Sequence, residues 1–138
     1  MLAKKIFITE RDAKRLSALI HSGTSPGENG PFYLKQLEGE IARAEIVDSQ
    51  KIPRDVVTMN SLVKFRDLGD REVFVYSIVY PDAADYAKGK VSVLAPIGMA
   101  LLGCRAGDVV EWPVPAGIRK LKIEEVLYQP EAAGQYDL

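Results

Sequence analysis

From residue 53 onward the chain carries six short runs of β-branched and aromatic residues, and this pattern limits its possible folds more than any other feature. Turn-forming residues such as Gly69-Asp70 and Gly107-Asp108 separate the runs. The runs cover residues 56–59, 62–65, 73–80, 91–94, 109–114 and 121–127. Because short strands joined by tight turns usually pair with their neighbours, we expect one antiparallel β-sheet.

One apolar stretch between the fourth and fifth runs has the character of a short helix. It begins with Pro96, which suits the first turn of a helix, and ends at Gly103, a frequent C-terminal cap. We expect this helix to pack in the concave face of the sheet, with Leu101 and Leu102 in the core. So short a helix cannot bury all its apolar side chains on one face, and part of them should stay exposed. The residues expected to be exposed are Pro96, Ile97 and Met99.

The first 52 residues follow a helical pattern instead. Thr9 occupies the position of an N-cap, and apolar residues then recur at helical spacing as far as Ser22. A cluster of turn residues at 23–30 separates this helix from a second one, which is expected to begin at Pro31. The apolar residues of the second helix follow the 3,4,3 spacing of a coiled-coil seam: Leu34, Leu37, Ile41 and Ala44.

Two interpretations of these helices stay open. They fit an antiparallel hairpin with a polar tip, whose arms of about 14 to 16 residues would be roughly 21 to 24 Å long. They fit equally two amphipathic helices packed flat on a core. In both cases the chain is α+β, with an N-terminal helical unit at 1–52 and a sheet unit at 53–138. The tail from Gln129 to Leu138 mixes Pro, Ala and Gly and is expected to be loosely ordered.

Charge and hydropathy limit the classes of partner. Lys and Arg total 18 and Asp and Glu total 19 among the 138 residues, so the formal charge is −1. A nearly neutral chain has no electrostatic basis for sequence-specific DNA binding, and a protein partner or small ligand is favoured. No stretch approaches the roughly 18 to 20 apolar residues of a membrane span, and no signal-peptide core is apparent. We therefore expect a cytoplasmic protein without membrane contact.

Residues suited to catalysis or metal binding are scarce. With one cysteine, Cys104, and one histidine, His21, the chain can form neither an intrachain disulfide nor a His/Cys zinc site. We expect Cys104 to be a packed or partly exposed structural residue and His21 to close the first helix. The serines lack His/Asp partners, and no G-x-x-x-x-G-K-[ST] loop is present. These observations predict no catalytic residue, no metal site and no cofactor.

The stretch from Val91 to Val110 combines several motifs of one known family. Its strand leads into a helix that starts Pro96-Ile97, ends Leu102-Gly103 and is followed by a Gly107-Asp108-Val109 turn. This combination resembles the C-terminal domain of the GreA and GreB transcript cleavage factors. With the helical hairpin in front, the resemblance covers nearly the whole chain. The stretches 52–61 and 128–134 are more similar to one branch of that family, the regulators of nucleoside diphosphate kinase.

The resemblance implies a fold and a set of partners. It implies an FKBP-like C-terminal domain behind a short N-terminal coiled coil. It also implies docking at the rim of the secondary channel of bacterial RNA polymerase, in competition with Gre factors, and a direct or indirect link to nucleoside diphosphate kinase. The docking residues that it implies are Ala95, Pro96, Ile97, Gly98 and Met99.

The tip of the hairpin departs from the Gre pattern. The cleavage factors carry an acidic D-x-x-E-N motif there, whose two carboxylates help to hold a catalytic Mg²⁺. This chain keeps Glu28-Asn29, but Ser25 stands at the position of the first acid. The hairpin is also shorter than a Gre hairpin. We therefore expect a regulator that binds polymerase and does not cleave transcripts.

Three other functions stay open at this point. A Gre-type cleavage factor could rely on Glu28 alone, and a direct regulator of nucleoside diphosphate kinase is neither favoured nor excluded by the residues. An FKBP-like prolyl isomerase would need a pocket lined by the strand aromatics, which we expect instead to lie in the sheet core or under the hairpin. These aromatics are Phe65, Phe74, Tyr76, Tyr80 and Trp112.

Overall fold

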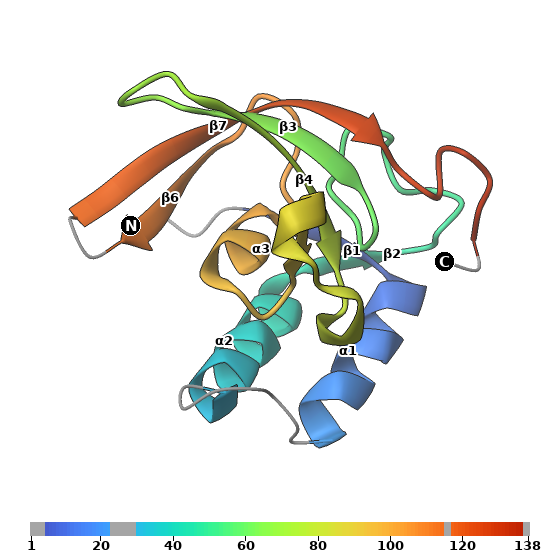
Figure 1. Cartoon of the computed structure of the whole chain (residues 1–138). Helices are drawn as coiled ribbons and strands as arrows, with labels where there is room; N and C mark the ends of the chain where they lie inside the picture. The colour runs from blue at the N-terminus through green and yellow to red at the C-terminus, as the bar shows by residue number, and fades with distance from the viewer. Residues whose placement is uncertain (1–4, 23–29, 115–116, 137–138) are drawn as a thin grey trace.

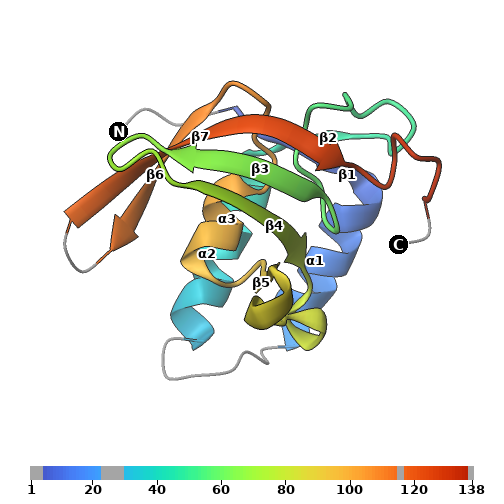
Figure 2. The ribbon, with the colours of Figure 1, turned by 45° about the horizontal axis from the view of Figure 1, so that its top comes forward.

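The computed structural model describes residues 5–22, 30–114 and 117–136 (Figure 1). Within these ranges a curved five-stranded sheet forms one layer, and the α-helices pack below its concave face (Figures 1 and 2). The chain is therefore α+β, as its pattern predicts. No helix of the described ranges has the length and apolar character needed to cross a membrane.

The sheet has the strand order β5-β4-β3-β7-β6. Most neighbouring strands are antiparallel, but β4 and β5 are parallel, which corrects the expectation of a wholly antiparallel sheet. Parallel strands need a crossover connection, and the two 3-10 turns after β4 provide it. The strands are β3 (Leu62–Asp67), β4 (Val73–Val79), β5 (Lys90–Ser92), β6 (Val109–Val114) and β7 (Gly117–Tyr128); the turns are η1 (Pro81–Ala83) and η2 (Tyr86–Lys88).

The prediction of a strand at 56–59 is wrong. This segment is a buried loop in which the Val57 N–H donates to the Cys104 carbonyl oxygen (2.8 Å) and the Val57 carbonyl accepts from the Gly103 N–H (2.8 Å). Val56, Val57 and Met59 are almost fully buried. The β-branched residues of the loop therefore reflect burial in the core rather than a place in the sheet.

The two predicted helices are present. α1 (Glu10–Ser22) begins directly after Thr9, whose Oγ1 accepts a hydrogen bond from the Asp12 N–H (3.0 Å), so the predicted N-cap is confirmed. α2 (Gly30–Arg43) lies beside α1 and runs in the opposite direction (Figure 1). With 14 residues, α2 is about 21 Å long, at the lower limit of the expected length, and α1 with 13 residues is one residue shorter than expected.

A pair of three-residue strands frames the helices and has no counterpart in the sequence prediction. β1 (Phe7–Thr9) and β2 (Glu45–Val47) are parallel neighbours. The Phe7 N–H also donates to the Gly103 carbonyl oxygen (3.0 Å). These backbone bonds join the base of the helix pair to the loop that follows α3 (Pro96–Leu101).

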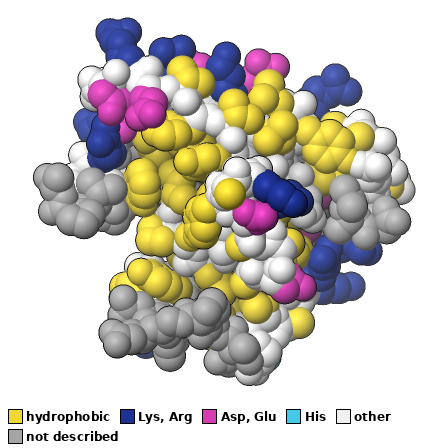
Figure 3. All heavy atoms as spheres, in the orientation of Figure 1, with side chains coloured by type: hydrophobic (Ala, Val, Ile, Leu, Met, Phe, Trp, Pro, Cys, Tyr) yellow, Lys and Arg dark blue, Asp and Glu magenta, His cyan; other side chains and the backbone are white. Residues whose placement is uncertain are grey.

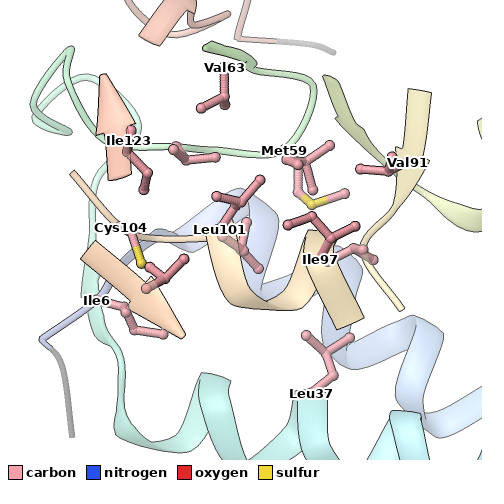
Figure 4. Packing of buried hydrophobic residues seen from close by; sticks show 14 of the residues in the cluster. Ile6, Leu37, Met59, Val63, Val91, Ile97, Leu101, Cys104 and Ile123 are labelled. Carbon is pink, nitrogen blue, oxygen red and sulfur yellow. The ribbon is translucent and has the colours of Figure 1, made fainter. Parts of the chain in front are cut away.

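The helices and the sheet share one hydrophobic core. α3 packs against β4, β5 and β6 on the concave face, and Leu101 and Leu102 are buried, as predicted. Leu37 of α2 lies below Ile97 and Leu101 of α3 in the same cluster (Figure 4). Since Leu16 and Leu34 also belong to this cluster, the structure places the helices on a shared core. The helices therefore pack on the core of the sheet, whichever of the two interpretations describes their contact with each other.

The expectation of a loosely ordered tail is wrong for its first part. The Gln129 side-chain amide is buried and donates to the carbonyl oxygens of Pro53 and Val56, both at 2.8 Å. Glu131 accepts a hydrogen bond from the Thr58 hydroxyl (2.7 Å). Buried polar groups need such partners, and these bonds fix the chain after β7 to the loop at 53–58.

Candidate docking surface

The residues at the start of α3 divide between surface and core. Pro96 is exposed, and Ala95 and Met99 are partly exposed. Ile97 is only 7% exposed, so the expectation that it lies on the surface is wrong. Residues four positions apart share one face of a helix, and Ile97 therefore points into the core with Leu101 (Figure 4).

Gly98 is buried because the helix backbone runs very close to β5. A Cβ atom at this position would lie 2.2 Å from the Ser92 carbonyl oxygen and 3.2 Å from the Val93 Cα. Such a separation is far inside van der Waals contact. Gly98 thus allows α3 to lie against β5, and through that packing it sets the position of Pro96 and Met99.

Hydrophobic side chains gather over α3 and the adjoining strands on the side of the molecule seen in Figure 3. Beside Met99 lies a hollow of about 110 Å³, which is bordered by the charged residues Glu40, Arg43 and Glu111. An apolar centre with a charged rim is typical of protein interfaces. We define the apolar face as Ala95, Pro96 and Met99 of the α3 segment.

Of the strand aromatics, Phe65 is buried in the core and the other four pack against it. Phe65 is 2% exposed, and its ring stacks on Phe74 (5.3 Å between centroids) and meets Tyr76 edge-on (5.6 Å). Tyr80 and Trp112 are partly buried against the same cluster.

Cys104 and His21, which the sequence analysis singled out, both occupy positions where their contacts are structural. The Cys104 thiol is buried and donates to the Ala100 carbonyl oxygen (3.4 Å), as a packed cysteine would. His21 is exposed in the last turn of α1, with Nδ1 2.8 Å from the Ser17 carbonyl oxygen. Glu28 and Asn29 lie outside the described residues, so the structure does not place the predicted hairpin tip. The described residues contain no group of three or more His, Cys, Asp or Glu side chains suited to a metal ion.

A buried carboxylate connects α1 to the sheet unit, and the sequence did not indicate its role. Asp12 is 3% exposed, and its Oδ2 accepts a hydrogen bond from the Met59 N–H (3.1 Å). Burial raises the pKa of Asp12 to about 6, and the nearby Glu131 charge acts in the same direction. The Met59 hydrogen bond and the Arg15 charge oppose this rise in pKa without cancelling it.

Tyr80 lies next to this carboxylate. The Arg15 guanidinium lies 4.2 Å from the centroid of its ring, a cation–π contact between α1 and the end of β4. Burial, together with the Asp12 charge, raises the pKa of the phenol, and the Tyr80 hydroxyl has no hydrogen-bond partner among the described residues. We call Asp12, Arg15, Met59, Tyr80 and Glu131 the polar junction. These residues come from α1, the loop after residue 53, the end of β4 and the C-terminal segment, so no local sequence pattern connects them.

Two family models match the chain. The model described as "Transcription elongation factor, GreA/GreB, C-term" matches residues 52–128, and the model described as "Rnk N-terminus" matches residues 4–47. Together they span the sheet unit and the helix pair.

Sequence similarities to known proteins point to the same two families. The regulator of nucleoside diphosphate kinase from Escherichia coli (strain K12) is 43% identical over 132 residues, which are 95% of each chain. Transcription elongation factor GreA from Clostridium botulinum (strain Hall) is 42% identical over 91 residues, which are 66% of this chain and 57% of that protein.

A solved structure extends the similarity to the fold. The prokaryotic transcription elongation factor GreA/GreB from Nitrosomonas europaea is 44% identical, with a TM-score of 0.73 over 91% of this chain and 100% of that one. The curved sheet with α3 in its concave face is thus a GreA/GreB-like fold. The chain belongs to the GreA/GreB family of transcription elongation factors and, within it, is related over almost its whole length to the Rnk regulators.

Proposed function

We propose that this protein is a Rnk-like regulator that binds bacterial RNA polymerase at the rim of the secondary channel and does not cleave transcripts. The observation that carries the proposal is the identity of 43% with a regulator of nucleoside diphosphate kinase over 95% of both chains. The match of residues 52–128 to the GreA/GreB C-terminal family supports the choice of polymerase as the partner.

In this proposal the apolar face docks on polymerase. Pro96, Met99 and Ala95 supply the contact, because they are the accessible residues of the segment 95–99. Ile97 and Gly98 act as positioning residues, since both are buried and fix α3 on the core. The charged rim around Met99 would confer specificity more than affinity.

We propose that the protein does not cleave transcripts because its hairpin lacks one of the two acids of the Gre motif. A Mg²⁺ ion needs several oxygen ligands, and a catalytic site of the Gre type uses two carboxylates. The sequence offers Glu28 but has Ser25 three residues earlier. Glu28 alone would bind such an ion weakly. The short helices would also hold the hairpin tip further from the polymerase active centre than the longer Gre hairpin reaches.

The same proposal covers three structural details. We propose that the sheet domain is FKBP-like, that the helix pair is a short coiled coil and that the domain boundary lies near residue 52. The curved sheet over α3 supports the first of these, and the Leu34, Leu37 and Ile41 spacing supports the second. A factor of this kind acts in the bacterial cytoplasm, and its link to nucleoside diphosphate kinase is direct or runs through transcription.

Replacing Met99 with aspartate is expected to weaken binding to core RNA polymerase by tenfold or more. A charge placed in an apolar contact loses its hydration without gaining a partner, which costs on the order of 1 to 3 kcal/mol. The measurement is an equilibrium binding titration with fluorescently labelled protein. Leu127→Asp is the matched control, because Leu127 is exposed on β7 outside the apolar face and should bind like the parent. Unchanged affinity of a folded Met99→Asp variant would contradict docking through this face.

A further inference from the structure

A groove of about 590 Å³ lies along the first turns of α1 and shares no residue with the apolar face. Its size falls within the roughly 300 to 1,000 Å³ that small-molecule sites occupy. α1, the turn after β2 and the C-terminal segment each contribute to its walls. The lining residues are Glu10, Arg11, Lys14, Arg15, Asp48, Ser49, Gln50 and Tyr136.

Three cations line one wall of the groove. Arg11, Lys14 and Arg15 occupy positions i, i+3 and i+4 of α1, so their side chains share one face of the helix. Asp12 points the other way, into the core. The contact of Arg15 with the Tyr80 ring orients its guanidinium. Guanidinium groups bind phosphate in a bidentate manner, and a lysine ammonium adds a point charge.

The remaining walls of the groove provide hydrogen-bond acceptors and an aromatic ring. In the turn after β2, the Asp48 carboxylate accepts a hydrogen bond from the Gln50 N–H (2.8 Å), and the Lys51 N–H donates to the Asp48 carbonyl oxygen (2.9 Å). Glu10 and Asp48 add two carboxylates that can accept hydrogen bonds from hydroxyl groups. Tyr136 is 39% exposed and offers an aromatic face for stacking.

We propose that this groove binds a nucleoside diphosphate or triphosphate. The adjacent phosphates would lie on Arg11, Lys14 and Arg15, the ribose hydroxyls would face the carboxylates, and the base would stack on Tyr136. The two carboxylates disfavour a uniformly charged polyanion, because such a ligand would bring negative charge next to them. The tyrosine favours a ligand with a ring over a bare diphosphate. The proposal is independent of polymerase docking.

The test is calorimetric titration of the full chain with ADP, GDP, AMP and pyrophosphate. ADP or GDP is expected to bind at least tenfold more tightly than AMP, with affinity that falls as salt is raised. Arg11→Ala and Lys14→Ala should each weaken nucleoside diphosphate binding about tenfold. Tyr136→Ala should lower the affinity for the nucleotides but leave the affinity for pyrophosphate unchanged.

Lys120→Ala is the matched control, because Lys120 is exposed on β7 at the far end of the sheet. It should leave every affinity unchanged. The proposal is overturned if no nucleotide shows saturable binding, if Lys120→Ala weakens binding as much as Lys14→Ala, or if a short RNA binds more tightly than the nucleotides. It is equally overturned if pyrophosphate binds as tightly as ADP. None of these outcomes bears on Met99 or on polymerase binding, so the two proposals fail separately.

Discussion

Asparagine in place of Asp12 is expected to stabilise the protein at pH 8 by about 3 kcal/mol. The folded protein raises the pKa of Asp12 from the ordinary 3.8 to about 6, and each pKa unit corresponds to about 1.4 kcal/mol. Asparagine resembles the neutral acid in shape and can still accept the Met59 hydrogen bond through its oxygen. The substitution therefore removes the cost of burying a charge and keeps the contact between α1 and the core.

The pH dependence of this effect has a definite sign. Below pH 3.8 the Asp12 carboxyl is protonated in both the folded and the unfolded chain. Between pH 3.8 and about 6 only the folded chain binds the proton, so the free energy of unfolding falls as the pH rises through this window. The advantage of Asp12→Asn over the parent should therefore be near zero at pH 4 and constant above about pH 7.

Urea denaturation of both proteins between pH 4 and pH 8 measures this difference. Asp82→Asn, at an exposed position in η1, serves as the matched control for the loss of one carboxylate and should not reproduce the gain of about 3 kcal/mol. A second variant, Asp12→Ala, should destabilise the protein because it leaves the buried Met59 N–H without its acceptor. If Asp12→Asn were less stable than the parent at pH 8, the buried charge would be a net stabiliser and the account of the junction would be wrong.

Alanine at Gly98 is expected to destabilise the protein by about 3 kcal/mol or more. The added methyl carbon would lie 2.2 Å from the Ser92 carbonyl oxygen, and the neighbouring atoms belong to backbone that cannot rotate away. Relief requires α3 to move off β5, which would open the packing around Ile97. Overpacking of this kind usually costs about 1 to 3 kcal/mol, and a backbone clash is at the upper end of that range.

Gly39 provides the matched control for this substitution. It lies on the exposed side of α2, and a Cβ atom there would meet nothing within 4 Å. Gly39→Ala should therefore stabilise the protein by roughly 0.5 to 1 kcal/mol, because alanine favours the helix. Thermal and urea unfolding of both variants would test the pair. Equal effects of the two substitutions would contradict the close approach of α3 to β5.

Much of the fold was predictable because its signals are local. β3, β4 and β6 are runs of β-branched and aromatic residues bounded by turns, and α3 is bounded by a proline and a glycine. The Thr9 N-cap acts within one turn of helix and was predicted for the same reason. Such features depend on residues close in sequence, so one sequence is sufficient to find them.

The errors arose where distant parts of the chain decide the structure. Residues 56–59 have strand-like composition, but their backbone bonds go to Gly103 and Cys104 rather than to a neighbouring strand. β1 and β2 have only three residues each, which is too short for a periodic pattern. Ile97 was expected on the surface because periodicity cannot say which side of a short helix faces the sheet. These outcomes depend on contacts between segments far apart in the chain.

The candidate sites show the same division. The proposed docking segment at 95–99 was chosen from its motif, while its division into accessible Pro96 and Met99 and buried Ile97 came from the packing. The polar junction and the groove on α1 combine residues from three regions of the chain, which no local pattern connects. In the groove, Arg11, Lys14 and Arg15 of α1 lie beside the turn at 48–50 and Tyr136, which are far from them in the sequence.

The shared core has a consequence for how the protein would sit on polymerase. Leu16, Leu34 and Leu37 are buried with the sheet residues, and the Asp12 to Met59 bond adds a polar contact between the same parts. The direction of the helix pair is therefore fixed relative to the apolar face by burial and hydrogen bonding. Docking through α3 would then set where the helices point, so one interface would determine whether the hairpin enters the channel.

A competition titration on core RNA polymerase tests the central proposal most directly. A labelled GreA factor is bound to the polymerase, and this protein is added in increasing amounts. If both proteins use the secondary-channel rim, GreA should be displaced fully and the polymerase should not hold both at once. Met99→Asp should require at least tenfold more protein for the same displacement. Simultaneous binding of the two factors, or no binding of this protein at all, would contradict the proposed function.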